Sequence, residues 1–134
     1  MKSYIAAVLA AILAALFLVT SEIVPAQQTR SEMIAVSASD KTASASVGSQ
    51  AGRSPFFLLF DKQGRLVEAV DNPYKDAGNA GIPTLEFLVG KGVKVLVAES
   101  FGSRIVEVMK GKGMRPVEFK GSASDAVKKA MDLR

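Results

Sequence analysis

The segment from Lys94 to Gly113 changes from a strand pattern to a helix pattern within a few residues, and this change most constrains the fold. Val95–Ala98 is a short apolar run of the length typical of a buried strand. After the connector Glu99–Gly102, the apolar residues of Ser103–Met109 recur at helical spacing. A strand that leads directly into a helix is the unit of α/β folds, so the sequence predicts helices packed against a sheet.

The other elements are predicted from the same two periodicities. Four more strands are expected, at Met33–Ser37, Pro55–Asp61, Arg65–Val70 and Arg115–Lys120. Two more helices are expected: one buries Ile82, Leu85, Leu88 and Val89, and the other starts at a Ser124–Asp125 cap and buries Ala126, Val127, Ala130 and Met131. The order is therefore β-β-β-α-β-α-β-α.

Right-handed crossovers make the first, fourth and fifth strands parallel. The second strand runs antiparallel to the first and forms a hairpin with the third, through the turn Lys62–Gly64. The predicted architecture is a three-layer α/β/α sandwich around a five-stranded mixed sheet of order 3-2-1-4-5. The segment Ala38–Ser54 is rich in Ser, Ala and Gly, which predicts a long, mobile loop.

This topology brings the loops together at one edge of the sheet. The segments Ala38–Ser54, Asp71–Gly81, Glu99–Gly102 and Gly121–Ser122 all meet there, and open α/β sheets bind ligands at this edge. Candidate ligand contacts are Ser39, Asp40, Gln50, Arg53, Asn72, Ser100, Gly102, Ser103 and Arg104.

Among these candidates, the helix start after Gly102 is the strongest. Its free N–H groups and the helix dipole favour an anion by about 0.3–1 kcal/mol, and Arg53 is a second contact for an anion. Two plainer readings stay open, in which Gly102 only closes a strand–helix junction and Arg53 is a solvated surface residue. No phosphate-loop motif is present, and the favoured reading assigns no residue as a metal ligand.

The first 26 residues have the layout of a secretory signal. Lys2 precedes an apolar run from Tyr4 to Val19, and Val24-Pro25-Ala26 is a small-residue cleavage site. We expect residues 1–26 to be a signal peptide, or an N-terminal membrane anchor if they are retained. Residues 27–32 then form a flexible lead, residues 33–134 form one domain, and the protein is exported to the periplasm or the extracellular space.

The charge pattern gives no indication of nucleic-acid binding. The net charge is +4, and the basic residues are spread along the chain apart from the cluster Lys110–Arg115. That cluster fits a helix C-terminus, where cations complement the dipole, and no aromatic residues are interleaved with it. A contact with a membrane is expected only through an uncleaved N-terminal segment.

Several segments resemble the dinitrogenase iron–molybdenum cofactor biosynthesis family, which includes carriers of the nitrogenase cofactor. They are "MIAVSASD", "GSQAGRSPFFLLFD", "GVKVLVAESFG" and "GSASDAVKKAM", and the resemblance extends from Met33 to Met131. It implies a ribonuclease H-like fold that holds an iron–sulfur or iron–molybdenum type cluster at the loop edge. Gln50 stands where many members have a His before Phe-Gly-Arg, and Ala51 replaces the aromatic residue.

The composition limits how such a cluster could be bound. The chain contains no His and no Cys, so the imidazole and thiolate ligands that iron clusters prefer are missing. Backbone N–H groups and Arg53 could still hold an anionic cluster through contacts to its outer atoms. The identity of the cofactor is therefore not fixed by the sequence.

Three functions are consistent with these patterns. The favoured one is a non-catalytic module that binds a small anionic ligand or a metal cluster at the loop edge. The second is an extracytoplasmic interaction scaffold or homodimer that pairs through the edge strand Arg65–Val70. The third is a hydrolase in which Asp40 and Glu99, with Asp71 as a further ligand, hold divalent ions.

Overall fold

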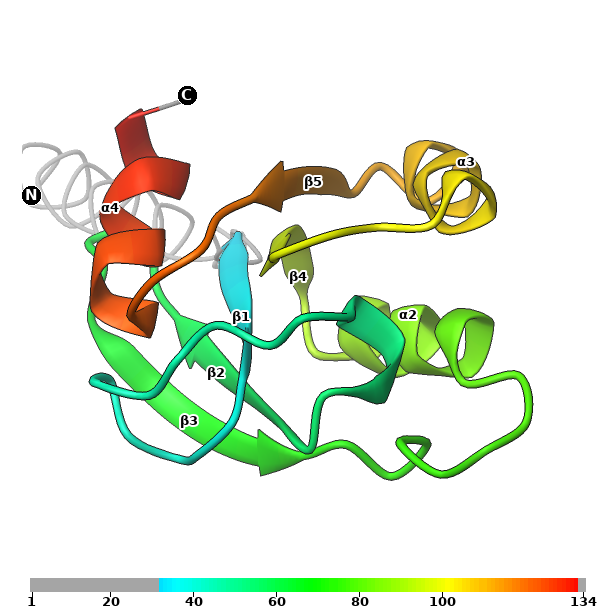
Figure 1. Cartoon of the computed structure of the whole chain (residues 1–134). Coiled ribbons are helices and arrows are strands. Elements are labelled where there is room, and N and C mark those ends of the chain that lie inside the picture. Colours follow the sequence, from blue (N-terminus) through cyan, green and yellow to red (C-terminus); the bar gives the residue numbers. More distant parts are fainter. Residues whose placement is uncertain (1–31, 133–134) are drawn as a thin grey trace, which may run out of the picture.

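The computed structural model describes residues 32–132, which form a mixed sheet of five strands (Figure 1). The spatial order is β3-β2-β1-β4-β5, with β1 antiparallel to β2 and parallel to β4. This confirms the predicted strand order. The strands are β1 (Met33–Ala38), β2 (Phe56–Phe60), β3 (Leu66–Asp71), β4 (Val93–Ala98) and β5 (Arg115–Glu118).

Helices cover both faces of this sheet, so the predicted three-layer architecture is also confirmed. One face is covered by α4, and the other by α2 and α3 (Figure 1). A single 3-10 turn, η1, lies in the loop between β1 and β2. The helices are η1 (Ala51–Arg53), α2 (Gly81–Gly90), α3 (Ser103–Gly111) and α4 (Ala123–Asp132).

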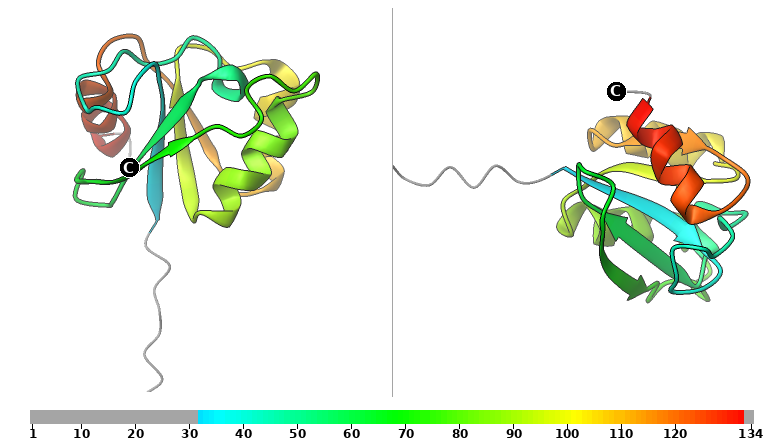
Figure 2. Two further views of the ribbon diagram at one scale, coloured as in Figure 1. Left: turned by 90° about the horizontal axis from the view of Figure 1, so that it is seen from below. Right: turned by 90° about the vertical axis from the view of Figure 1, so that its left-hand side faces the viewer.

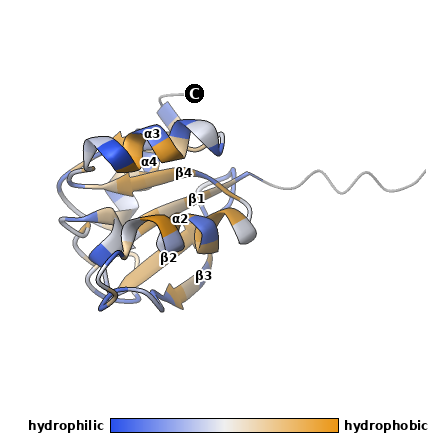
Figure 3. Ribbon diagram, turned by 90° about the vertical axis from the view of Figure 1, so that its right-hand side faces the viewer, coloured by the Kyte–Doolittle hydropathy of each residue, from blue (hydrophilic) through white to orange (hydrophobic). Residues whose placement is uncertain are grey.

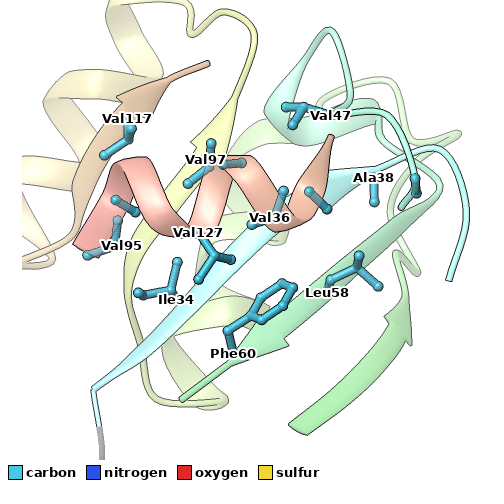
Figure 4. Close-up of a cluster of buried hydrophobic side chains, with 14 residues drawn as sticks. Ile34, Val36, Ala38, Val47, Leu58, Phe60, Val95, Val97, Val117 and Val127 are labelled. Carbon is cyan, nitrogen blue, oxygen red and sulfur yellow. The ribbon is translucent and has the colours of Figure 1, made fainter. Parts of the chain in front are cut away.

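The core beneath α4 is made mostly of small and β-branched side chains, with Leu58 and Phe60 from β2. Ala126, Val127 and Ala130 of α4 pack on Ile34 and on the inward side chains of β2, β4 and β5 (Figure 4). The Ala residues allow the helix to approach the sheet closely, and their spacing of three to four residues keeps them on one helix face. The predicted buried face of this helix is confirmed for these three residues, while Met131 is only partly buried.

The core on the opposite face is built from larger side chains. Leu85 and Leu88 of α2 and Met109 of α3 are buried against β1, β2 and β4, and the strands behind these helices are mostly hydrophobic in Figure 3. Val89 was predicted to be buried, but it is 38% exposed. Thr84 is buried instead. Its side-chain hydroxyl faces Gly52 of η1 and Asn72 of the β3–α2 loop, which shows how α2 is rotated about its axis.

The loop between β1 and β2 is bonded to the sheet, so the expectation of a loose loop was wrong. The N–H of Gly48 donates to the carbonyl of Ser37 (2.8 Å), and the N–H of Glu99 donates to the carbonyl of Gly48 (3.0 Å). Ala45 and Val47 are buried in the core under α4. These backbone bonds and apolar anchors are long-range contacts, which the low-complexity composition of the segment did not reveal.

The start of α4 also differs from its prediction. Ser124 and Asp125 were expected to form the cap, but the hydroxyl of Ser122 accepts the N–H of Asp125 at 3.3 Å. The carbonyl of Ser122 also accepts the first intrahelical bond, from the N–H of Ala126. Ser122 therefore has the role of the N-cap, two residues before the predicted one.

The predicted signal peptide or anchor and most of the flexible lead lie outside the described residues. Among residues 32–132, no helix is long and apolar enough to cross a membrane.

The β2–β3 turn is held by one carboxylate. Asp61 accepts the backbone N–H groups of Gln63 and Arg65 on Oδ1 and the Arg65 Nε on Oδ2, all within 2.9 Å. The backbone N–H of Arg65, together with the other bonds and the Arg65 charge, lowers the pKa of Asp61 below its usual 3.8. Gly64 completes the turn at a φ of +80°, which other residues rarely adopt.

Replacing Asp61 by Asn gives a pH-dependent effect on stability. Because the pKa of Asp61 is lowered by folding, its contribution to the free energy of unfolding is present above the unfolded-state pKa and is lost as the pH falls through the folded-state pKa. Urea unfolding of Asp61→Asn should show a loss of stability at pH 7 that disappears in strong acid. Asp76→Asn, in an exposed loop, is the control and should change little at either pH. A deficit of Asp61→Asn that does not vary with pH would contradict this role of the carboxylate.

Candidate functional site

The loop edge of the sheet contains a cavity of about 510 Å³ between η1, the start of α2 and the β4–α3 connector. The loops that form it lie at the upper side of the left view in Figure 2, away from the end where β1 begins. Polar side chains, glycines and a few apolar residues share its wall. They are Gln50, Ala51, Gly52, Arg53, Gly78, Asn79, Ala80, Gly81, Ser100, Phe101, Gly102 and Ile105.

A second cavity, of about 290 Å³, adjoins the first on the side of β1. Gln50 and Arg53 line both cavities, so their side chains stand between them. The remaining wall of the smaller cavity is formed by Ser39, Val47, Gly48, Ser49, Ser54, Pro55 and Glu99.

The side chain of Asn72 fixes η1 at this edge. Its amide nitrogen donates to the carbonyls of Gly52 (2.9 Å) and Ser54 (3.0 Å), and its amide oxygen accepts the N–H of Tyr74 (3.0 Å). Asn72 is 3% exposed, and its position directly after β3 is set by the sheet. One buried side chain therefore ties the end of the edge strand to the turn that carries Arg53.

Glycine allows η1 to approach the start of α2. A Cβ atom on Gly52 would lie 3.0 Å from the Cα of Gly81 and 3.2 Å from its nitrogen, closer than side chains normally come to a backbone. A Cβ on Gly81 would in turn collide with Ile105 of α3. These two glycines let three elements from distant parts of the sequence meet around the larger cavity.

Two helix N-termini, those of α2 and α3, open on the larger cavity. In the described structure neither helix start has a side-chain cap, and neither has an acidic residue in its first turn. The start of α4 differs in both respects, because Ser122 caps it and Asp125 lies in its first turn. First-turn N–H groups without intrahelical partners are donors for a ligand, and both dipoles favour negative charge at this point.

The side-chain charges around the two cavities are unequal. Arg53 is exposed and lines both cavities, whereas Glu99 lines only the smaller one. No Asp or Glu lines the larger cavity. The larger cavity is therefore the one whose charges and backbone dipoles all favour an anion.

The structure brings together five of the nine residues expected from the sequence. Ser39, Gln50, Arg53, Ser100 and Gly102 line one or both cavities. The hydroxyl of Ser100 donates to the carbonyl of Ser49 at 2.8 Å, which joins the β4–α3 connector to the β1–β2 loop.

The other four expected residues do not line either cavity. Asp40 is exposed and accepts the N–H of Lys41, and the polar atoms of Asn72 are used within the protein. Ser103 and Arg104 are exposed in the first turn of α3.

The sequence predicted that the loop Asp71–Gly81 lies at this edge, but none of its last four residues was expected to contact a ligand. The stretch Gly78–Gly81 lines the larger cavity, as do Ala51, Phe101 and Ile105. The available signal was the pair of glycines, Gly78 and Gly81, around the helix start, because glycine lets a ligand approach the backbone closely.

The described residues offer no side-chain metal site. No group of three or more His, Cys, Asp or Glu side chains is gathered within residues 32–132. The three carboxylates considered for divalent ions are not clustered, and Asp71 forms an ion pair with Lys41 at 3.3 Å. A metal-containing ligand would have to be held by amides, Gln50 and Arg53 through its outer atoms rather than by direct ligation.

Comparison with known proteins supports the fold and gives a family. A model of the family described as "Dinitrogenase iron-molybdenum cofactor" matches residues 32–133. The chain is similar to a NifB-like protein from Thermotoga, with 27% identity, a TM-score of 0.65, and coverage of 75% of this chain and 88% of that one. It also shares its fold with the apo orange protein from Desulfovibrio gigas, at 23% identity, a TM-score of 0.70, and coverage of 77% and 89%. No curated protein matches the chain.

The close approach of η1 to α2 can be tested by adding one methyl group. Gly52→Ala should lower the free energy of unfolding by about 1–3 kcal/mol, because the new Cβ would press on the backbone of Gly81. Gly78→Ala is the matched control, since a Cβ there meets no atom within 4 Å. Chemical denaturation of both variants measures the difference, and equal stabilities of the two would show that the approach is not tight.

Proposed function

The chain belongs to the dinitrogenase iron-molybdenum cofactor family, and we propose that it is a non-catalytic module that binds a small anionic ligand or an anionic metal cluster. The proposed site is the larger cavity at the loop edge. The cluster, where that is the ligand, is cargo that the protein holds and releases. We further propose, from the export signal expected in residues 1–26, that the protein acts outside the cytoplasm.

One observation supports this proposal most strongly: the uncapped starts of α2 and α3 line the same cavity as Arg53. Each helix start favours an anion by about 0.3–1 kcal/mol at an exposed site. A hydrogen bond to a charged group such as the Arg53 guanidinium adds about 1.5–3 kcal/mol. These terms sum to about 2–5 kcal/mol, which corresponds to a weak affinity in the millimolar range and suits a carrier that releases its ligand.

The donor set determines which ligands fit. Backbone N–H groups, the Gln50 amide and the Arg53 guanidinium bind the outer oxygen or sulfur atoms of an anion. They are poor direct ligands for iron, which prefers thiolate and imidazole groups. The proposed ligand is thus an oxyanion such as molybdate, or a preassembled cluster that already carries its own sulfur atoms.

The edge strand β3 favours a second candidate function, a scaffold for protein contacts. Leu66 and Val67 are 41% and 58% exposed on this strand, which pairs with no strand on its outer side within residues 32–132. Unpaired strand edges can add a strand from a partner. Light scattering of the full chain would detect self-association, and a dimer that persists in Val67→Lys would exclude this edge.

Anion binding can be tested with molybdate as the probe. Molybdate should raise the melting temperature of the full chain, and Arg53→Gln should weaken its apparent affinity by roughly 10-fold, as expected from the loss of one charge-assisted hydrogen bond at an exposed site. Thermal shift at constant ionic strength measures both effects. Arg53→Lys should restore part of the affinity, because it keeps the charge but not the planar fork.

Arg104→Gln is the matched control for charge. Arg104 lies in the first turn of α3 but does not line either cavity. Its replacement should leave molybdate binding close to that of the wild type. Equal losses in both variants would indicate a general electrostatic effect, and the absence of any shift with molybdate would remove support for an oxyanion ligand.

A further inference from the structure

Charged residues are distributed unequally between the two ends of the sheet. Opposite the loop edge lie the starts of β1, β4 and β5, the β2–β3 turn, and the C-terminal ends of the three α-helices (Figure 2, left). We name this region the basic end. Its cations are Lys62, Arg65, Lys91, Lys94, Lys110, Lys112, Arg115 and Lys129.

The excess of positive charge belongs to this end alone. The basic end comprises residue 32 and the segments 61–65, 91–94, 110–115 and 129–132, with eight cations and three acids, hence 8 − 3 = +5. The loop edge comprises the segments 39–55, 71–81, 99–104 and 119–125, with five cations and five acids, hence 5 − 5 = 0. The domain is therefore electrically polarised along the direction of its strands.

Ion pairing and helix dipoles do not account for the whole excess. Lys91 and Lys112 pair with Glu68 and Glu86 at 3.4 and 3.9 Å. Counting these two acids leaves a net charge of 8 − 5 = +3, and Lys62 and Arg115, which belong to this sum, also interact with other groups. Four of the cations lie in the last turn of a helix or directly after it, where they complement the dipole. Lys94 within β4 has no such role, and its side chain is exposed.

The same end is where the chain enters the domain. Glu32 precedes the first residue of β1, so every residue before it in the sequence is joined to the basic end. The preceding sequence contains the apolar run Tyr4–Val19. Only residues 20–31 separate this run from the domain, a distance of at most about 40 Å when fully extended.

We propose that the basic end lies against an anionic phospholipid surface. Lys and Arg side chains near such a surface each strengthen binding about fivefold, so several exposed cations on one end give a preferred orientation. In this orientation the loop edge and its cavities face away from the lipid. The ligand site is then accessible to solutes and partners while the domain rests on the membrane.

Site-specific fluorescence can test the orientation, because the chain has no native Cys. The full chain carrying Lys94→Cys or Lys75→Cys is labelled and added to vesicles that contain a headgroup quencher. The vesicles are phosphatidylcholine alone, or phosphatidylcholine mixed with phosphatidylglycerol. We expect strong quenching of the label at position 94 only with phosphatidylglycerol and at low salt, and weak quenching at position 75 in the loop edge.

Charge removal tests the cause of the orientation. The variant with both Lys110→Gln and Lys129→Gln is made in the chain labelled at position 94. Its ratio of membrane-bound to free protein should fall roughly 25-fold, or about fivefold for each cation removed. Lys75→Gln with Lys120→Gln, at the loop edge, is the control and should leave the ratio unchanged. Circular dichroism confirms that each variant is folded.

Three results would overturn the proposal. The first is equal quenching at positions 94 and 75, and the second is quenching that does not depend on phosphatidylglycerol. The third is that double-stranded DNA binds the chain through the same lysines and that the vesicles do not quench the label. This result would identify nucleic acid as the anionic partner. None of these measurements depends on molybdate binding, so the two proposals stand or fall separately.

Discussion

The buried amide of Asn72 is the interaction on which the loop edge depends. By donating to the carbonyls of Gly52 and Ser54, it holds η1 against the end of β3. That position places Arg53 beside the starts of α2 and α3, which come from a different half of the chain. Without this link, η1 would keep its contacts with Thr84 and Gly81 of α2 but would lose both of its hydrogen bonds to the end of β3.

The parallel arrangement of β1, β4 and β5 gives both ends of the molecule their chemistry. Right-handed crossovers direct the N-termini of the helices to one edge of the sheet and their C-termini to the other. The first edge is thereby rich in N–H donors, and glycine and the absence of caps leave those donors open on α2 and α3. The opposite end collects the cations that helix C-termini favour. A site for an anionic ligand and a basic face are thus two results of one topology.

Much of the fold could be predicted from the sequence because the signals were local. Two local signals predicted the strand order correctly. They are the change from a strand pattern at Val95–Ala98 to a helix pattern at Ser103–Met109, and the hairpin around Gly64. The missed features depend on contacts between distant residues. Three of them follow from packing that no sequence periodicity encodes. They are the exposure of Val89, the burial of Ala45 and Val47, and the cap at Ser122. In the site, Arg53 and Gly102 were found from residue type and topology, whereas the contribution of Gly78–Gly81 required the close approach of η1 to α2.

The central claim is that backbone amides at two helix starts, together with Arg53, bind an anion in one cavity. The most direct measurement is a titration of the ¹⁵N-labelled full chain with molybdate, followed through its backbone amide resonances. We expect the largest saturable shifts at Gly52, Gly81, Gly102 and Ser103, with a single dissociation constant for all four. Shifts confined to the basic end around Lys94 and Lys110, or shifts at the loop edge that never saturate, would contradict the account.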